Sequence, residues 1–221
     1  MEECRIKNLY NIDETIAKSL LEKYEYPWEV LAHIEEFIIN IGNTLNKEEY
    51  KQTAENVWIH KSANVYESAY IKGPCIICEN AEIRHCAFIR GKAIVGKDAV
   101  VGNSTELKNV ILFNNVQVPH YNYVGDSILG YKAHMGAGSI TSNVKSDKKL
   151  VVIKNKNKTY ETNIKKIGAM IGDNVEVGCG CVLNPGTIIG KESNIYPLSS
   201  VRGVIPANSI YKNCNEIVTK K

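Results

Sequence analysis

Aliphatic residues recur at every sixth position through much of this 221-residue chain. The longest run keeps strict register over eight positions: Val65, Ile71, Ile77, Ile83, Ile89, Val95, Val101 and Leu107. Small residues stand four places after most of them, namely Ala69, Cys75, Ala81, Ala87, Ala93, Ala99 and Thr105. A helix repeats near 3.6 residues and an ordinary strand near 2, so a period of six fits neither alone. It indicates a short strand followed by a tight turn, repeated along the chain, with both kinds of residue pointing inward.

The register slips after Leu107 and then resumes in two further runs. The first contains Val118, Val124, Leu129 and Met135, and the second contains Ile171, Val177, Leu183, Ile189, Ile195 and Val201. The pattern resembles that of hexapeptide-repeat proteins, which implies a mainly β fold, a left-handed parallel β-helix with three hexapeptides in each triangular coil. The left hand follows from the resemblance alone, because crossovers between parallel strands are otherwise right-handed. We assign residues 55–213 to the β-helix and residues 214–221 to a C-terminal tail.

Residues 1–54 do not follow the repeat. Their apolar residues are three and four apart and predict two helices, the first with Ile12, Ile16, Leu20, Leu21 and Tyr24, and the second with Leu31, Ile34, Phe37, Ile38 and Ile41. Asp13 is the expected N-cap of the first helix, Pro27 suits the first turn of the second, and Gly42 is its expected stop. We expect this helical segment to cap the open first coil, because the ends of a solenoid need covering.

A second break in the repeat covers residues 142–166. Leu150 to Ile153 is strand-like, residues 155–157 are turn-like, and Thr159 to Ile164 could form the return strand, which predicts a hairpin inserted into the solenoid. The insertion carries eight lysines, at positions 145, 148, 149, 154, 156, 158, 165 and 166. Such a charge run is usually a solvated face, and the functional alternative is a lid that brings positive charge to a phosphate.

Polar residues can be placed on the coils in the same way, since residues eighteen apart stack on one face of a solenoid with eighteen-residue coils. Arg90 and Lys108 are eighteen apart and each directly follows an inward aliphatic residue, so the two cations form a potential anion site. His120 lies twelve positions beyond Lys108, in a slot that faces outward. A lone histidine is more often structural than catalytic. The neighbouring cations and the glycine-rich turn at residues 136–138 give the two readings equal weight.

The segments around these residues carry a more specific resemblance. The sequences ELK at 106–108, HYNYVGD at 120–126 and GAGSITSN at 136–143 resemble the acetyltransferase domain of the bifunctional UDP-N-acetylglucosamine pyrophosphorylase/glucosamine-1-phosphate N-acetyltransferases. The resemblance covers roughly residues 57–212. The archaeal sugar-1-phosphate nucleotidylyltransferase/acetyltransferases look closer still, because they too carry a long insertion before the last coils. The resemblance implies transfer of an acetyl group from acetyl-coenzyme A to the amine of a glucosamine-1-phosphate-like sugar.

The resemblance also assigns roles by position. It implies His120 as the general base; Arg90, Lys108, Tyr123, His134, Asn143 and Lys149 (or its neighbour Lys148) as substrate-binding residues; and Ala137, Cys179 and Pro197 as residues of the acetyl-coenzyme A groove. Three of these positions depart from the family's pattern. Cys179 replaces a serine, Pro197 replaces an alanine, and His134 replaces an asparagine that contacts the substrate in the bacterial enzymes. The last departure leaves the identity of the acceptor sugar open.

These residue types suit acetyl transfer for physical reasons. An amine attacks a thioester only when it is deprotonated, and an imidazole accepts that proton near neutral pH. The carbonyl oxygen gains negative charge and needs an N–H donor, which a glycine-rich turn can supply. An arginine–lysine pair that holds the phosphate also fixes the position of the amine. Sites of this family lie between the subunits of a trimer, so we expect a homotrimer.

Composition narrows the expected setting and partners. The formal charge of +3 does not indicate a nucleic-acid partner, and no apolar run approaches the roughly 18 residues that span a membrane. Seven cysteines, an odd number, fit free thiols in the cytoplasm. The first 50 residues contain a single glycine, Gly42, and leave no room for a nucleotide-binding domain, so we expect no pyrophosphorylase activity.

Two alternatives stand beside the transferase. Cys75, Cys78, His85 and Cys86 invite a zinc site, but the repeat places Cys75 in an inward slot and the others on turns or outward positions, so we expect no metal. The other alternative is a non-catalytic trimeric β-helix that binds a sugar phosphate or a nucleotidyltransferase partner, with the helical segment as the docking surface. Binding of coenzyme A discriminates between this module and the enzyme.

Overall fold

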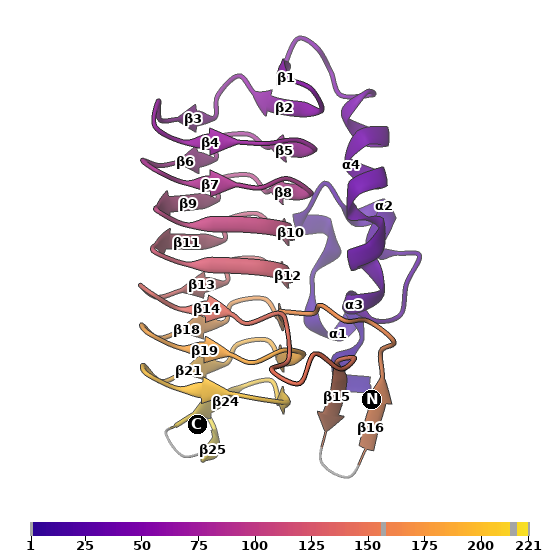
Figure 1. Cartoon of the computed structure of the whole chain (residues 1–221), viewed down its shortest axis with the longest axis vertical. Coiled ribbons are helices and arrows are strands. Elements are labelled where there is room, and N and C mark those ends of the chain that lie inside the picture. Colours follow the sequence, from indigo (N-terminus) through magenta and orange to yellow (C-terminus); the bar gives the residue numbers. More distant parts are fainter. Residues whose placement is uncertain (1, 156–157, 213–215, 221) are drawn as a thin grey trace.

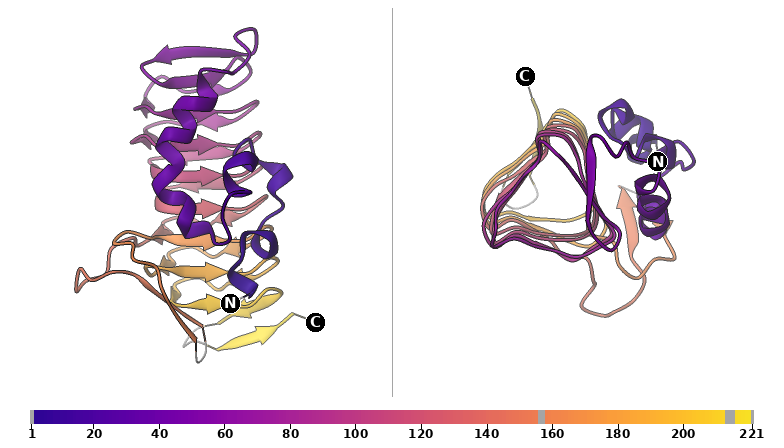
Figure 2. Two further views of the ribbon diagram at one scale, coloured as in Figure 1. Left: turned by 90° about the vertical axis from the view of Figure 1, so that its right-hand side faces the viewer. Right: turned by 90° about the horizontal axis from the view of Figure 1, so that it is seen from above.

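The chain folds into a stack of short strands with a helical segment along one side (Figure 1), and the view along the stack shows a three-sided prism (Figure 2). The structure is a computed structural model that describes residues 2–155, 158–212 and 216–220. The strands of successive coils pair in parallel, in the manner of a left-handed parallel β-helix. The predicted fold class is therefore confirmed.

Each side of the prism is a ladder of short strands. The first face contains β2 (Val57–His60), β5 (Cys75–Ile77), β8 (Ala93–Val95), the C-terminal halves of β10 (Glu106–Leu112) and β12 (Tyr123–Leu129), β17 (Ala169–Ile171), β20 (Thr187–Ile189) and β23 (Val204–Ile205). The second face contains β4 (Tyr70–Ile71), β7 (Phe88–Ile89), the N-terminal halves of β10 and β12, β14 (Ile140–Thr141), β19 (Val182–Leu183) and β22 (Ser200–Val201). The third face contains β3 (Asn64–Val65), β6 (Glu82–Ile83), β9 (Val100–Asn103), β11 (Gln117–His120), β13 (His134–Met135), β18 (Glu176–Val177), β21 (Asn194–Ile195) and β24 (Ser209–Tyr211).

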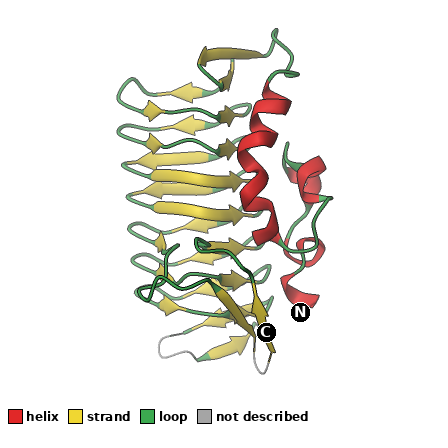
Figure 3. Cartoon of the chain, turned by 45° about the vertical axis from the view of Figure 1, so that its right-hand side comes forward, coloured by secondary structure: helices red, strands yellow, loops and turns green. Residues whose placement is uncertain are grey.

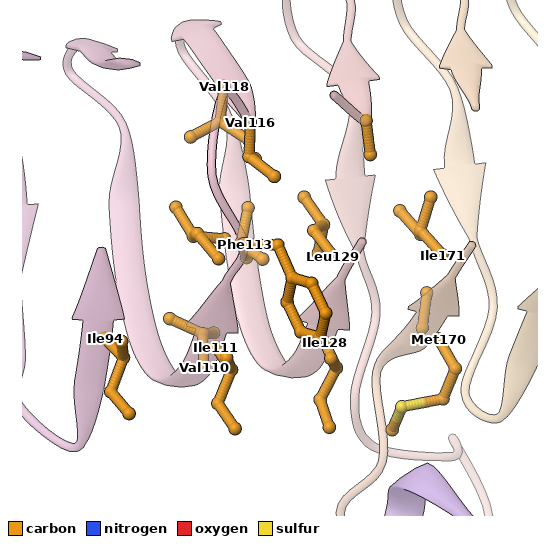
Figure 4. Packing of buried hydrophobic residues seen from close by; sticks show 14 of the residues in the cluster. Ile94, Val110, Ile111, Phe113, Val116, Val118, Ile128, Leu129, Met170 and Ile171 are labelled. Carbon is orange, nitrogen blue, oxygen red and sulfur yellow. The ribbon is translucent and has the colours of Figure 1, made fainter. Parts of the chain in front are cut away.

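The six-residue repeat lines the interior. From Ile77 to Leu107 every aliphatic residue of the run is fully buried, and so are the small residues that follow them from Cys75 to Thr105. Figure 4 shows Ile94, Ile111, Ile128 and Met170 of successive first-face strands in one row. They alternate along their strands with inward residues such as Val95 and Leu112, so this row lies on the outer side of the first face. Val65 and Ile71 are only half-buried, because they belong to the first coil and have no coil above them.

The slip in register has a structural cause at the corner between the second and first faces. On the second face Phe88 pairs with Glu106, eighteen positions later, whereas on the first face Ala93 pairs with Val110, seventeen positions later. One residue is therefore missing from this corner in β10, and β12 keeps the shorter spacing, since Val110 pairs with Ser127. As a result β10 and β12 run through the corner as continuous strands and join the two faces into one sheet.

The helical segment packs against the first face. Its elements are η1 (Glu2–Cys4), α1 (Ile6–Leu9), η2 (Ile12–Glu14), α2 (Lys18–Leu21), α3 (Pro27–Val30), η3 (Leu31–His33) and α4 (Ile34–Gly42). Helix α4 contacts β5, β8 and β10, and the ring of Tyr10 lies 5.2 Å from that of Phe113. Figures 2 and 3 show the helices running alongside the coils. The prediction that they cover the open first coil was wrong, since α4 contacts strands of three successive coils on the first face.

Details of the helices also differ from the prediction. Residues 12–24 form only the short pieces η2 and α2, because Thr15 between them is extended, with φ −156° and ψ 146°. The N-cap of η2 is Asn11, whose side chain accepts from the Asp13 N–H, and not Asp13 itself. Pro27 does begin α3, and α4 does end at Gly42. A Cβ at Gly42 would lie 2.5 Å from the ring of Trp58, so close packing of this ring against the helix requires the glycine.

Residues 142–166 form the expected hairpin, with β15 (Val152–Asn155) antiparallel to β16 (Lys158–Glu161). Residues 156 and 157 of the predicted turn, including Lys156, lie outside the described residues. The chain ends with β25 (Ile217–Thr219), which pairs antiparallel with β24, so the predicted tail adds a strand to the last coil. An antiparallel strand also borders the first coil, where β1 (Tyr50–Ala54) pairs with β2. Among the described helices none has the length and apolarity needed to cross a bilayer.

Burial in the prism predicts how two leucines contribute to stability. We expect Leu129→Ala to lower the free energy of unfolding by about 2–5 kcal/mol, because Leu129 is fully buried between coils. The matched control is Leu150→Ala in the insertion, where Leu150 is 45% exposed and the change should be within about 0.5 kcal/mol. Guanidinium unfolding monitored by circular dichroism measures both. Equal losses in the two variants would contradict the interior assigned to Leu129.

Candidate functional site

His120 belongs to a column of residues at the corner between the third and second faces. Successive members of the column are linked by backbone hydrogen bonds of 2.8–3.0 Å. In each link, the residue that follows the lower member donates its N–H to the carbonyl of the upper member. The column contains Asn103, His120, Ala137, Cys179 and Pro197. His120 therefore lies directly above the three positions that were expected to line a coenzyme groove.

The surroundings of His120 leave its side chain open. The residue is exposed, and its imidazole makes no hydrogen bond with any residue in the described ranges. Its backbone is fixed instead, since the N–H donates to Asn122 Oδ1 at 3.1 Å and the carbonyl accepts from Gly138. Asn122 is buried and also donates to the carbonyls of Gly136 and Ser139. The imidazole is thus held at the corner while both ring nitrogens remain available to a ligand.

The glycine-rich turn offers fewer donors than its composition suggests. The Gly136 N–H donates to the Val177 carbonyl at 2.7 Å, and the Gly138 N–H donates to His120. The N–H of Ala137 has no acceptor within the part of the chain that the structure describes, and the residue is exposed. The donor available one coil below His120 is therefore the Ala137 N–H.

A second cluster forms at the other edge of the second face, around the carboxylate of Asp126. Lys108 Nζ lies 3.0 and 2.9 Å from the two carboxylate oxygens. Asn109 Nδ2 donates to Oδ1 at 2.9 Å, and Asn143 Nδ2 donates to Oδ2 at 2.6 Å. The Asp126 side chain is only 5% exposed and the Lys108 side chain 25%, so this ion pair is shielded from water. We call Lys108, Asn109, Asp126 and Asn143 the Asp126 cluster.

Tyr123 and Arg90 extend this cluster across the second face. The Asn143 amide also donates to the Tyr123 hydroxyl at 3.2 Å. Burial first, and then the negative charges of Asp126 and Glu106, raise the pKa of Tyr123, so the phenol stays neutral and keeps its proton to donate. Arg90 stacks above Lys108 in register, and its guanidinium lies 2.6 Å from a carboxylate oxygen of Glu106. The hydrogen bond to Glu106 raises the pKa of Arg90.

The structure therefore adds carboxylates that the sequence interpretation missed. The two cations expected to form an anion site are each paired, Arg90 with Glu106 and Lys108 with Asp126. Each cation retains N–H groups beyond those pairs, because a guanidinium has five and an ammonium has three. Asp126 lies eighteen positions after Lys108, but the spacing between these two coils is seventeen and Lys108 pairs with Gly125, so the eighteen-residue rule does not identify the contact.

Two expected substrate residues lie away from the Asp126 cluster. His134 is on the third face, where its Nδ1 lies 2.7 Å from Glu176 Oε2. Lys149 is exposed on the insertion, and its backbone N–H donates to Asp147. Within the described ranges neither Lys149 nor Lys148 contacts the Asp126 cluster. Asn143 connects the insertion to that cluster, because its carbonyl accepts from Ile167 and closes the base of the insertion.

A groove runs beside the His120 column. It has a volume of about 480 Å³ and is lined on the third face by His134, Glu176, Cys179, Tyr196 and Pro197, among others. Cys179 is exposed at its edge. His134 thus belongs with the expected coenzyme positions rather than with the Asp126 cluster.

The described cysteines do not gather into a metal site. No group of three or more potential ligands occurs in the described part of the chain. Cys75 is buried as expected, and Cys78, which was expected on a turn or an outward position, is buried as well. Burial raises the pKa of the Cys78 thiol to about 11 and raises that of Cys75 as well, which disfavours the thiolates that zinc requires.

The pairing of Lys108 with Asp126 can be tested by a double-mutant cycle. We expect a coupling energy of about 2 kcal/mol between Lys108→Met and Asp126→Asn, because the pair is shielded and shares hydrogen bonds. The control cycle uses Lys97→Met and Glu79→Gln, an ion pair at 3.1 Å whose side chains are about half exposed, and should give less than about 1 kcal/mol. Chemical unfolding of the wild-type protein and the six variants gives both values, and equal couplings would contradict the shielded pair.

Comparison with known proteins finds one family model and several curated relatives that resemble this chain. The family model described as the GMPPB C-terminal domain matches residues 71–165. The bifunctional protein GlmU of Methanococcus maripaludis is 35% identical over 199 residues, covering 89% of this chain and 48% of the relative. The bifunctional sugar-1-phosphate nucleotidylyltransferase/acetyltransferase of Sulfurisphaera tokodaii is 30% identical over 174 residues, covering 71% of this chain and 43% of the relative.

Solved structures include the polySia specific acetyltransferase NeuO, with a TM-score of 0.49 and 14% identity, over 66% of this chain and 70% of that chain. The chain spans about half the length of the curated relatives that it matches. Over most of its own length, the chain is thus similar to the bifunctional GlmU and nucleotidylyltransferase/acetyltransferase proteins, as the sequence motifs indicated.

Proposed function

We propose that the chain is an N-acetyltransferase that moves an acetyl group from acetyl-coenzyme A to the amine of an amino-sugar-1-phosphate of the glucosamine-1-phosphate type. His120 is the general base in this proposal. The observation that carries it is the placement of His120 and the cations at opposite edges of the same face of the prism. The names of the relatives, which include an acetyltransferase, support the same class of reaction.

The second face separates the two cations from His120. At the level of His120 it consists of Tyr123, Val124 and Gly125, which span roughly 10 Å at about 3.3 Å per residue. A phosphate held by Arg90 and Lys108 at one edge would extend the sugar across Tyr123 toward His120 at the other. Asn143 and the neutral Tyr123 hydroxyl offer donors and acceptors to the sugar hydroxyls along the way. The separation between the cations and His120 would thus favour acceptors whose amine lies at a fixed distance from the phosphate.

The proposed reaction needs one base and one oxyanion donor. The His120 imidazole accepts a proton as the amine nitrogen forms a bond to the thioester carbonyl carbon. The carbonyl oxygen takes negative charge in the tetrahedral intermediate, where the Ala137 N–H can donate to it. The carbon–sulfur bond then breaks, the amide carbonyl re-forms, and the coenzyme leaves as a thiol after taking a proton from the imidazolium.

The groove below His120 is the proposed binding site of the coenzyme. Ala137, Cys179 and Pro197 succeed one another in the same column, so an extended pantetheine arm could lie along them and bring its thioester to His120. His134 lines this groove, and we therefore propose that it contacts the coenzyme or the acceptor at the edge of the third face. Lys149 stays a predicted substrate contact. In this proposal it reaches the substrate through a movement of the insertion or from a neighbouring subunit.

Exposed apolar side chains support the proposed homotrimer. Five of the large exposed hydrophobic residues lie on the second face or beside its corner with the third face: Tyr70, Phe88, Tyr121, Tyr196 and Leu198. The first face is already covered by the helical segment. A neighbouring copy packed over the second face would cover these side chains and enclose His120 together with the Asp126 cluster. The active site would then be completed between subunits.

The proposal predicts the effect of removing the base. We expect His120→Ala to lower kcat for acetyl transfer by about a hundredfold to ten-thousandfold, with the oligomeric state unchanged. The control is His60→Ala, since His60 lies in the first coil and its imidazole hydrogen-bonds only to Ser62 among the described residues. A thiol-release assay with acetyl-coenzyme A and a panel of amino-sugar-1-phosphates measures turnover, and light scattering measures assembly.

Full activity in His120→Ala would remove that residue from the mechanism. If no acceptor in the panel were acetylated and the wild-type chain did not bind coenzyme A, the enzyme proposal would be wrong. The non-catalytic module that binds a sugar phosphate or a protein partner would then be the better account.

The position of the coenzyme can be tested through the cysteines. We expect acetyl-coenzyme A, which has no free thiol, at ten times its Kd to slow maleimide labelling of Cys179 by about tenfold, because the bound pantetheine arm would cover it. Cys86 is also exposed but lies outside the groove, and its labelling should not change. Peptide mass spectrometry follows each site separately. Equal labelling of Cys179 with and without the coenzyme would contradict the proposed groove.

A further inference from the structure

A basic pocket lies between the inserted hairpin and the last coils, apart from the site described above. Its volume is about 500 Å³. Three cations line it: Lys145 and Lys154 from the insertion, and Arg202, which directly follows β22. Its apolar lining includes Val152, Val204 and Ile205. It shares no lining residue with the groove beside the His120 column.

The charge in this pocket is positive and largely uncompensated. The lining contains no acidic residue among those that the structure describes. Lys154 forms no ion pair within the described ranges, and Arg202 donates to the neutral amide oxygen of Asn184 at 2.9 Å. Lys145 has one acidic neighbour, Asp147, at 3.3 Å. Three cations around one cavity with so little compensation favour a ligand with more than one negative charge.

The walls of the pocket are fixed by packing on both sides of the hairpin. Val151 and Ile153 are fully buried, and a Cβ at Gly186 would lie 2.7 Å from the Val151 side chain. On the other side, the ring of Tyr160 lies 5.0 Å from Tyr26 and 5.4 Å from Trp28 of the helical segment. The hairpin is thus held between the last coils and the helices, so the cations on it have a preformed scaffold.

We propose that this pocket binds a nucleoside phosphate. The cations would hold the phosphates, and the apolar lining would receive the base or the ribose. A volume of about 500 Å³ lies within the usual range for a small-molecule site, roughly 300–1,000 Å³. Inorganic phosphate alone would leave the apolar lining unused. The nucleotide could be free in solution, or it could be the nucleotide end of a coenzyme A molecule, and both share the chemistry proposed here.

Calorimetric titration of the full chain with ADP tests this site. We expect ADP to bind, and the double variant Lys154→Gln/Arg202→Gln to bind it at least about tenfold more weakly, because two charge-assisted contacts are lost. The matched control is Lys158→Gln/Lys166→Gln, which changes the net charge equally on insertion residues that do not line the pocket. No binding of ADP to the wild-type chain, or equal affinity in the two double variants, would overturn the proposal.

Two further arms separate the alternatives. Adenosine should bind much more weakly than ADP, and equal binding would overturn the role of the cations. Displacement of ADP by coenzyme A would identify the coenzyme's nucleotide end as the occupant, whereas persistence of ADP would identify a free nucleotide. His120→Ala should bind ADP as the wild-type chain does. Nucleotide binding in this pocket can therefore be tested independently of the proposed transferase activity.

Discussion

The backbone hydrogen bonds between successive coils set the positions of everything else in this molecule. Because parallel strands stack about 4.8 Å apart, a residue on one coil fixes the place of its counterpart on the next. The His120 column is a direct result, since Ala137, Cys179 and Pro197 follow it in the ladder although up to 77 positions separate the first from the last in the sequence. Side chains from remote parts of the chain become one surface without any dedicated contact between them.

The missing residue at one corner turns this regular scaffold into a polar site. In β10 and β12 the chain passes through the corner as a continuous strand, and Asn109 and Asp126 adopt left-handed conformations there, with φ of 56° and 49°. The carboxylate of Asp126 then receives Lys108 and Asn109 from the coil above and Asn143 from the coil below. A buried carboxylate with three donors is stable only as a complete network, so each of these partners helps to hold the others. Asn143 also closes the base of the insertion, which ties the loop to the site.

The sequence predicted what depends on local spacing. The six-residue period identified the buried aliphatic residues from Ile77 to Leu107, the hairpin between residues 142 and 166, and the stacking of Arg90 above Lys108. It could not show which part of the solenoid the helices pack against, because the partners of Tyr10 and Trp28 are distant residues such as Phe113 and Tyr160. It also missed the pairing of Arg90 with Glu106, since the two lie on adjacent coils and nothing in their local sequence marks the contact.

The central claim is that the second face holds the phosphate site, Arg90 and Lys108, at a fixed distance from the proposed base, His120. A crystal structure of the full chain with glucosamine-1-phosphate and coenzyme A tests this claim most directly. Our account predicts the phosphate within hydrogen-bond distance of Arg90 and Lys108, and the amine within about 3.2 Å of the His120 imidazole or linked to it through one water. A sugar phosphate bound elsewhere, or one bound with its amine pointing away from His120, would contradict the account.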